Sequence, residues 1–224
     1  MTKTYETLTS VLQSRWSCRA FLPTAVPAGD IVRIVSSARH VPSWCNAQPW
    51  QLEITSGDAT DRLRAALQTE ATVSAPAPDL PWPTGYSGVY RDRRRACGYQ
   101  LYDAVGIEKT DREGSARQMM KNFAFFGAPH VAILHSPSEL GPYGAMDSGG
   151  FVSTFTLIAQ SLGIASIPQA AVAAYGPFLH GYLNIPKDRL ILCAIAFGYA
   201  DTTHPANGFR TARAEASDII AWHE

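Results

Sequence analysis

Residues 189–200, RLILCAIAFGYA, decide the fold. This apolar run has the length of a strand and predicts the best core strand of the chain. It is too short to cross a bilayer as a helix. Working outward from it, we expect further strands at residues 50–55 (WQLEIT), 130–136 (HVAILHS) and 164–171 (IASIPQAA), the last ending at Pro168.

The pattern of apolar residues predicts more helices than strands. Helices are expected at residues 4–15, 29–40, 58–70 (with Asp58 as its cap), 90–107, 110–126 and 145–162, followed by a broken helix at 172–185. The fold class is therefore α+β, a mixed sheet enclosed by helices. Residues 145–162 are too apolar for a helix with one exposed face, and form either the spine of the domain or a dimer interface.

Composition sets the broad class. With 224 residues the chain can form one sizeable domain, 1–224. Lys plus Arg number 19 and Asp plus Glu number 19, so the net charge is zero, which argues against a nucleic-acid or membrane-surface partner. The N-terminus carries no signal-peptide pattern, which makes the cytoplasm the default location. The four cysteines form no CxxC pair and the histidines show no ligand spacing, so we expect reduced thiols and no metal.

Two arginine-containing motifs lie near the two ends of the chain. In SRWSCRAF, residues 14–21, alternate side chains of an extended segment point the same way, so Arg15, Ser17 and Arg19 can converge on a phosphate or another anion. Arg210 and Arg213 in FRTAR, residues 209–213, could close the same site. The plainer alternatives are a solvated helix end for the first motif and a surface tail for the second.

Two further motifs combine small and amide-bearing residues. PSWCNAQPW, residues 42–50, holds Ser43, Asn46 and Gln48 between two tryptophans, either as a local turn or as a loop that faces a flat ligand. GIASIPQAA, residues 163–171, predicts a strand end with free backbone N–H groups, or an ordinary strand-to-helix connection. No dinucleotide-binding GxGxxG, Walker loop, HExxH or GxSxG motif is present.

The proline-rich residues 74–85, SAPAPDLPWPTG, cannot form a helix or a central strand. They carry Trp82, and Tyr86 and Tyr90 follow. Because linkers are rarely aromatic, residues 74–100 are a candidate lid or pocket wall as well as a candidate linker. RDRRR, residues 91–95, is better explained as a solvated helix face than as a nucleic-acid patch.

Taken together and in this order, the four motifs and the 189–200 strand resemble the flavin-dependent nitroreductase family. The match spans residues 10–215, and residues 90–130 look like the branch that includes nitrobenzoate reductases. The resemblance implies an α+β fold with a mainly antiparallel sheet, an intertwined homodimer, and two FMN sites at the subunit interface.

By motif position, the resemblance also assigns the residues that contact FMN. Arg15, Ser17 and Arg19 would contact its phosphate, ribityl chain or pyrimidine edge, and Ser43 and Asn46 would approach the flavin of the partner subunit. The full implied set is Arg15, Trp16, Ser17, Arg19, Pro42, Ser43, Trp44, Asn46, Gln48, Pro168, Gln169, Ala170, Arg210 and Arg213. The chain departs from the family pattern at Trp16, at Trp44 and Cys45, and at Thr211, where a basic residue, small residues and a lysine are usual.

The implied activity is reduction of nitroaromatic or quinone acceptors by NADH or NADPH in a ping-pong scheme. No obligatory catalytic side chain is expected, because the flavin carries the chemistry. Aromatic walls suit a small flat acceptor, and the candidates are Trp44, Trp82, Tyr86, Tyr90, Phe125 and Phe126. Arg91, or an arginine between 93 and 95, would receive an acceptor carboxylate. Alternatives are another flavin reaction, such as reductive dehalogenation or enone reduction, and a flavin-binding protein with little turnover.

Overall fold

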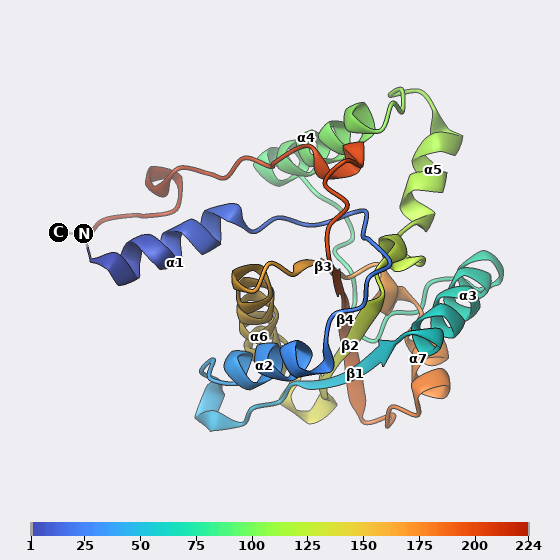
Figure 1. Cartoon of the computed structure of the whole chain (residues 1–224), viewed down its shortest axis with the longest axis horizontal. Coiled ribbons are helices and arrows are strands. Elements are labelled where there is room, and N and C mark those ends of the chain that lie inside the picture. Colours follow the sequence, from blue (N-terminus) through green and yellow to red (C-terminus); the bar gives the residue numbers. More distant parts are fainter. Residues whose placement is uncertain (1, 224) are drawn as a thin grey trace.

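The computed structural model describes residues 2–223, and its centre is a four-stranded sheet (Figure 1). Its strands are β1 (Gln51–Ser56), β2 (His130–Pro137), β3 (Ala165–Gln169) and β4 (Arg189–Gly198), in the spatial order β1-β2-β4-β3. All neighbouring strands pair antiparallel. The mixed character comes from a parallel bridge between Ser17 and Ser166, which adds the N-terminal segment beside β3. The expected strands and the α+β class are confirmed.

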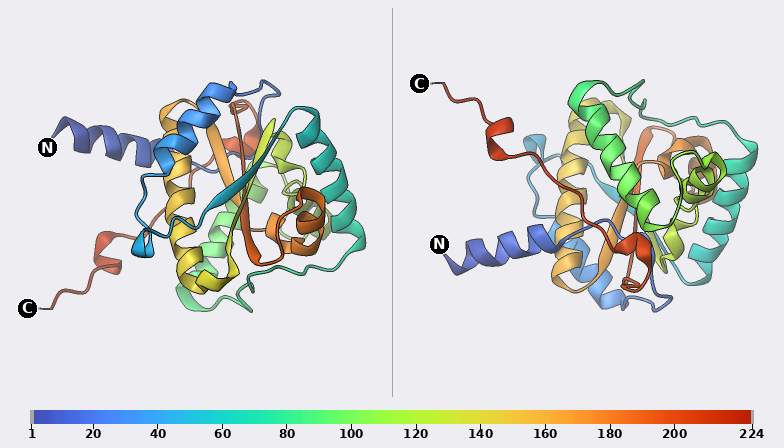
Figure 2. Two further views of the ribbon diagram at one scale, coloured as in Figure 1. Left: turned by 90° about the horizontal axis from the view of Figure 1, so that it is seen from below. Right: turned by 90° about the horizontal axis from the view of Figure 1, so that it is seen from above.

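Helices cover both faces of this sheet (Figures 1 and 2). Within the described residues the α-helices are α1 (Lys3–Ser14), α2 (Ala28–Ala38), α3 (Asp58–Val73), α4 (Gly88–Ala104), α5 (Arg112–Met120), α6 (Gly141–Ser161) and α7 (Gly176–Leu183). Every predicted helix is present, although several bounds differ. None of the helices described is both long and apolar enough to span a membrane.

Three helix boundaries correct the sequence-based expectations. Asp58 is the first residue of α3 rather than its cap, because Gly57 occupies the cap with a φ of 52°. The helix expected at 110–126 ends at Met120, and Phe125 and Phe126 adopt left-handed backbone angles of 52° and 51° in a short 3₁₀ turn. The helix expected from residue 145 begins four residues earlier, at Gly141.

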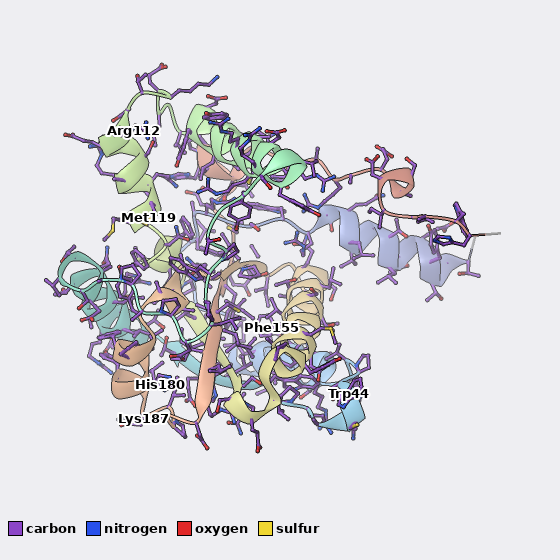
Figure 3. The ribbon with its side chains drawn as sticks, turned by 180° about the vertical axis from the view of Figure 1, so that it is seen from behind. Trp44, Arg112, Met119, Phe155, His180 and Lys187 are labelled. Carbon is purple, nitrogen blue, oxygen red and sulfur yellow. The ribbon has the colours of Figure 1, made fainter. Side chains whose placement is uncertain are left out.

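Alternation along the strands builds two hydrophobic layers. On β4, Ala194 and Ala196 face a layer with α3, whereas Ile195 and Phe197 face a layer with α2 and α6. Phe151 and Phe155 of α6 are fully buried in the second layer (Figure 3 labels Phe155). Helix α6 is therefore the spine of the domain, which was one of the two alternatives for this segment.

Two segments extend from the body on the same side: α1 and the tail after the 3₁₀ turn Pro205–Asn207 (Figure 2). Both present apolar side chains to solvent. Leu8 and Leu12 are 54% and 51% exposed on α1, and Ile219 and Trp222 are 75% and 82% exposed on the tail.

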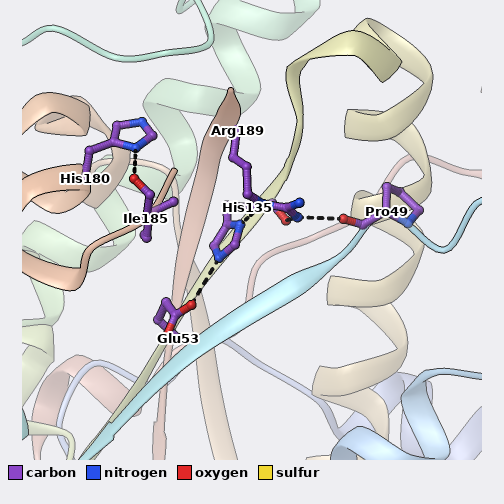
Figure 4. A network of polar contacts seen from close by, with 6 residues as sticks. All are labelled: Pro49, Glu53, His135, His180, Ile185 and Arg189. Atoms are coloured by element: carbon purple, nitrogen blue, oxygen red, sulfur yellow. Dashed lines mark hydrogen bonds and ion pairs between the residues drawn. The ribbon is translucent and has the colours of Figure 1, made fainter. Parts of the chain in front are cut away.

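A polar network lies where β2 ends and β4 begins (Figure 4). Arg189 donates to His135 Nδ1 and, through Nη2, to the carbonyl of Pro49 at 3.1 Å. His135 Nε2 lies 3.5 Å from Glu53 Oε1. Because arginine always donates, Nδ1 of His135 is unprotonated. Burial and the Arg189 charge both lower the pKa of His135.

A second buried histidine is also held neutral. His130 Nε2 accepts a hydrogen bond of 2.9 Å from the Val26 N–H, and burial lowers the pKa of His130. A neutral imidazole at both positions means that protons favour the unfolded chain. The stabilisation is complete above the ordinary histidine pKa of about 6.5 and is lost as the pH falls below it.

We therefore expect the free energy of unfolding to fall between pH 7.5 and 5.5, by at most about 1.4 kcal/mol for each of these histidines. His130→Gln keeps an acceptor for Val26 but does not titrate, so its loss over the same range should be smaller. Urea denaturation at both pH values measures the difference. An equal loss in both proteins would contradict a neutral, buried His130.

Candidate functional site

The N-terminal segment and the C-terminal tail enclose a cavity of about 540 Å³. We call it the arginine cavity, because Arg15, Arg19, Arg210 and Arg213 all line it. Ser17, Thr211 and Cys97 add polar groups, the last from α4. The volume lies within the usual range for ligand pockets. The structure thus brings together the two arginine motifs, which are nearly 200 residues apart in the sequence.

Aromatic rings and main-chain carbonyls hold three of these arginines in place. The Arg210 guanidinium lies 4.3 Å from the centroid of Trp16, and that of Arg19 lies 5.7 Å from Phe209. Arg19, Arg210 and Arg213 each donate to main-chain carbonyls. Trp16 replaces a basic residue of the family pattern, and its ring instead supports Arg210.

The arginine cavity is electrostatically unbalanced. Within residues 2–223, none of its four arginines forms an ion pair with a carboxylate. Burial lowers the pKa of Arg15, and repulsion from Arg213 lowers it further; burial also lowers the pKa of Arg19. Bringing like charges together costs free energy that an anion would recover. The chemistry of the cavity therefore suits a phosphate group.

Asn207 ties the two segments of the cavity together. It is 5% exposed, and its Oδ1 accepts from the Arg19 N–H at 2.8 Å. Its Nδ2 donates to the carbonyls of Ala20 and Asp201 at 2.9 and 2.7 Å. The sequence motifs did not include Asn207, because an asparagine in a tail gives no signal until its distant partners are known.

A second cavity of about 280 Å³ begins at Arg19 and ends at the turn after β3; we call it the turn cavity. Pro168, Gln169 and Ala170 line it, as the GIASIPQAA motif predicted for a site. The other walls include residues of α4, of α5 and of the turn after α5 that were missed from the sequence: Leu101, Tyr102, Gln118, Met119 and Asn122. Figure 3 shows Met119 on α5.

The turn cavity carries unsatisfied polar groups. Gln118 Nε2 and Gln169 Oε1 are buried without a hydrogen-bond partner, although Gln169 Nε2 donates to the carbonyl of Asn122 at 2.9 Å. The Ala170 N–H donates to no acceptor within the described part of the chain. Buried polar groups are normally paired, so these atoms suit a polar ligand edge that both donates and accepts.

A third cavity, about 410 Å³, shares Arg15 and Ser17 with the arginine cavity and Pro168 with the turn cavity. Its remaining wall is α6, through Val152, Ser153, Thr156 and Leu157. The three cavities therefore share residues and form one trough from the tail to the end of β3. Residues of three of the four predicted motifs, 14–21, 163–171 and 209–213, line this trough.

The fourth motif, residues 42–50, lies elsewhere. Cys45, Asn46 and Gln48 have φ values of 48°, 58° and 50°, which are costly for residues other than glycine. The loop is held by Asp147, which accepts from the Trp44 N–H at 3.0 Å, and by Ser43 Oγ, which accepts from the Gln48 N–H at 3.0 Å. Local turn bonds are therefore present, as the plainer alternative expected, alongside strain that is typical of functional loops.

Within the described residues, no member of this loop lines the trough. Trp44 is 60% exposed at the edge of the molecule, with its ring 4.8 Å from that of Tyr143 (Figure 3). Trp50 packs inward against Phe151, at a centroid distance of 5.2 Å. The loop is thus presented outward, away from the arginines of its own chain.

The predicted acceptor residues divide into three groups. Phe125 is fully buried in the core and lines none of the three cavities, whereas Phe126 lines the turn cavity. Trp82, Tyr86 and Tyr90 are 44%, 49% and 66% exposed, outside the trough. Arg91 is exposed and pairs with Asp92.

The first part of the 74–100 segment is attached to the body. The Ala77 N–H donates to the Ala174 carbonyl at 2.7 Å. Asp79 Oδ2 accepts from the Ile191 N–H at 2.8 Å and lies 2.9 Å from His180 Nε2. Within the described part of the chain, residues 80–86, which lead into α4, have no hydrogen bond of this kind to the body. A role for this segment as a lid stays a prediction.

Residues 12–199 match the family model described as the nitroreductase family. The chain belongs to the nitroreductase family. It is similar to the nitroreductase NfnB of Mycolicibacterium smegmatis, with 36% identity over 93% of this chain and 89% of the relative. It also resembles the 4-nitrobenzoate reductase of Pseudomonas putida, with 33% identity over 91% of this chain and 90% of the relative.

The fold comparison agrees. The crystal structure of the FMN-dependent nitroreductase NfnB from Mycobacterium smegmatis in complex with NADPH superposes with a TM-score of 0.94, at 34% identity, over 99% of this chain and 100% of that chain. The FMN- and NADPH-dependent NfnB of a Sphigopyxis strain superposes with a TM-score of 0.93 at 29% identity, over 97% of this chain and 99% of that one. This nitroreductase-family chain therefore has the fold that the resemblance implied.

Asn207 offers a test of how the trough is held together. Asn207→Ala should lower the free energy of unfolding by about 2–3 kcal/mol, because it leaves the Arg19 N–H and two carbonyls without their buried partner. It should also weaken binding of inorganic phosphate, since Arg19 loses its backbone anchor. Urea denaturation and a phosphate titration measure the two effects. Unchanged stability would show that Asn207 does not join the two segments.

Proposed function

We propose that this protein is an FMN-dependent oxidoreductase that uses NADPH or NADH to reduce nitroaromatic or quinone acceptors. The observation that carries the proposal is the trough, which starts at four arginines that form no ion pair within residues 2–223 and ends at the turn after β3. Nicotinamide nucleotides are plentiful in the cytoplasm, which is where we place the enzyme.

The residues of the trough fit FMN. Arg15, Arg210 and Arg213 would hold the phosphate, and its negative charge would offset the repulsion between Arg15 and Arg213. Arg19 lines both the arginine cavity and the turn cavity, so it would lie beside the ring. The unpartnered atoms of Gln118 and Gln169 would face the polar edge of the ring.

When bound, FMN supplies the hydride chemistry, in which the nicotinamide donor and the acceptor use one pocket in turn. The chain's own part is position and electrostatics. The Ala170 N–H, which has no acceptor within residues 2–223, would offer a hydrogen-bond donor at the end of β3, and the Arg19 charge would favour negative charge on the ring. No side chain of the trough needs to titrate, and protons come from water.

We further propose that the enzyme is a homodimer. The exposed apolar side chains of α1 and the tail, among them Leu8, Leu12 and Trp222, call for a covering surface, and zero net charge does not oppose association. The outward loop of residues 42–50 would then complete the trough of the partner subunit with Ser43, Trp44 and Asn46. This arrangement accounts for a strained loop that its own trough does not use.

The test uses the purified protein and added FMN. We expect a yellow holoprotein whose visible flavin absorbance is bleached by NADPH or NADH under nitrogen and restored by nitrobenzene or 4-nitrobenzoate. Arg15→Ala should lose FMN at least tenfold more readily, whereas Arg117→Ala, on the outer surface of α5, should retain it. A protein that binds no FMN would overturn the assignment.

Trp44 gives a separate prediction about the acceptor. If the loop of residues 42–50 faces the neighbouring trough, Trp44→Ser should change kcat/KM ratios among acceptors of different size by about tenfold and leave FMN retention unchanged. Steady-state kinetics on a series of nitroarenes, with flavin content as the second readout, distinguishes the two. Loss of FMN without a change in acceptor preference would make Trp44 a structural residue.

A further inference from the structure

Residues 80–107, which include α4, form an arm with few attachments to the body. None of these residues is buried. Within residues 2–223, their hydrogen bonds and ion pairs all join members of the arm to one another. A segment with few buried contacts opens locally at a small cost in free energy. The position of the arm therefore depends on the points where the chain enters and leaves it.

The arm nevertheless forms one wall of the trough. Cys97 lines the arginine cavity, and Leu101 and Tyr102 line the turn cavity. Helix α4 also lies beside the 3₁₀ turn Pro205–Asn207, from which the C-terminal tail leaves (Figure 1). An arm that moved away from the body would therefore open both cavities.

Asp79 anchors the chain at the entry to the arm. Its Oδ2 accepts from the Ile191 N–H of β4 at 2.8 Å and lies 2.9 Å from Nε2 of His180 on α7. The side chains of Asp79 and His180 are only 18% and 13% exposed. Hydrogen bonds to a carboxyl group are strengthened where water is largely excluded. Asp79 thus joins the arm to the central strand and to α7.

The body is shaped to hold this carboxyl group. Nδ1 of His180 lies 3.0 Å from the Ile185 carbonyl oxygen (Figure 4). Because a carbonyl only accepts, Nδ1 donates, and the ring is fixed with Nε2 toward Asp79. A Cβ at Gly176 would lie 2.7 Å from Asp79 Oδ1, which is closer than van der Waals contact allows. Glycine at this position therefore leaves the room that the carboxyl group occupies.

The path of the chain on both sides of the anchor is also restricted. Just before it, the Ala77 N–H donates to the Ala174 carbonyl at 2.7 Å. Just after it, Pro81 and Pro83 each fix a backbone φ angle. Within the described chain, no hydrogen bond joins the residues between Asp79 and α4 to the body. The anchor is therefore the last such attachment before α4.

We propose that Asp79 is a positioning residue: together with His180 it holds the arm closed against the trough and so slows the release of the bound cofactor. Neither residue lines the trough, so both act through the arm and not on the ligand itself. The inference rests on the proposed function for the identity of the ligand, FMN, whereas the attachment of the arm does not depend on it.

The first test measures opening of the arm by trypsin, with FMN-loaded enzyme. The four arginines of residues 91–95 are exposed cleavage sites. Because most helical stability comes from packing, a helix that leaves the body frays and is cleaved faster. Asp79→Ala removes both hydrogen bonds and should raise the cleavage rate at residues 91–95 about tenfold. Asp79→Asn keeps an acceptor for the Ile191 N–H and should raise it less than about threefold.

The second test measures FMN release, as the rise in flavin fluorescence after dilution of the loaded enzyme. Asp79→Ala should release FMN about tenfold faster, because the arm opens more often. Its kcat at saturating FMN should stay within about twofold of the unsubstituted value, since the reacting groups are unchanged. The matched control is Asp30→Ala on α2, where Asp30 pairs with Arg33 at 2.9 Å. It should change neither cleavage nor release by more than about twofold.

A third variant keeps both members of the anchor. Gly176→Ala places a methyl group where Asp79 Oδ1 lies, so it should displace the carboxyl group. Cleavage at residues 91–95 and FMN release should both change in the same direction as in Asp79→Ala. Urea denaturation and mass spectrometry of the fragments separate opening of the arm from general unfolding, which would expose cleavage sites throughout the chain.

Three outcomes would overturn the inference. Fragments cut throughout the chain, with a lower urea midpoint, would make Asp79 a general stabilising residue. Faster cleavage in the arm with unchanged FMN release would show that the arm does not close the trough. Unchanged cleavage in Asp79→Ala would show that the arm is held elsewhere, for instance by a second copy of the chain. If the unsubstituted protein binds no FMN, the proposed function fails, and the cleavage rates still decide whether Asp79 anchors the arm.

Discussion

The pairing of β4 between β2 and β3 is the constraint on which the rest of the structure depends. The strand is hydrogen-bonded along both edges and buried on both faces, so it fixes two hydrophobic layers at once. The chain that leaves it meets the N-terminal segment, where the Leu22 N–H donates to the Tyr199 carbonyl at 2.8 Å. Asn207 then fastens the tail to Arg19 and Ala20. The arginines converge because the sheet brings their two backbones together.

The convergence of the arginines costs stability in the ligand-free chain and favours the binding of an anion. Four arginines share one cavity without a carboxylate partner among the described residues. Three of their guanidiniums contact Trp16, Phe209 or main-chain carbonyls. Burial, and after it repulsion from Arg213, lowers the pKa of Arg15. A phosphate-bearing ligand that binds only the folded chain would stabilise it by mass action. The loop of residues 42–50 also contains backbone conformations that cost free energy, as loops that take part in function often do.

Local patterns predicted much of the architecture. Residues 189–200 contain the central strand, and most of residues 145–162 belong to the spine helix α6. Both were predictable because a run of apolar residues indicates a buried segment. Some of the predictions made from local patterns were wrong. Phe125 and Phe126 continue an apolar helical pattern, yet α5 ends at Met120, and both phenylalanines have left-handed backbone angles, with Phe125 completely buried. Tertiary packing overrode helical propensity there.

The sequence by itself determined the strands, the helices, the family and three of the motifs that line the trough. Only the tertiary structure decided which helix faces close it. Gln118 and Asn122 carry no motif, and only the folded chain shows that they line the turn cavity together with Leu101 and Tyr102. The physical reason is that side-chain type is a local property, whereas orientation around a helix is fixed by contacts between segments far apart in the chain.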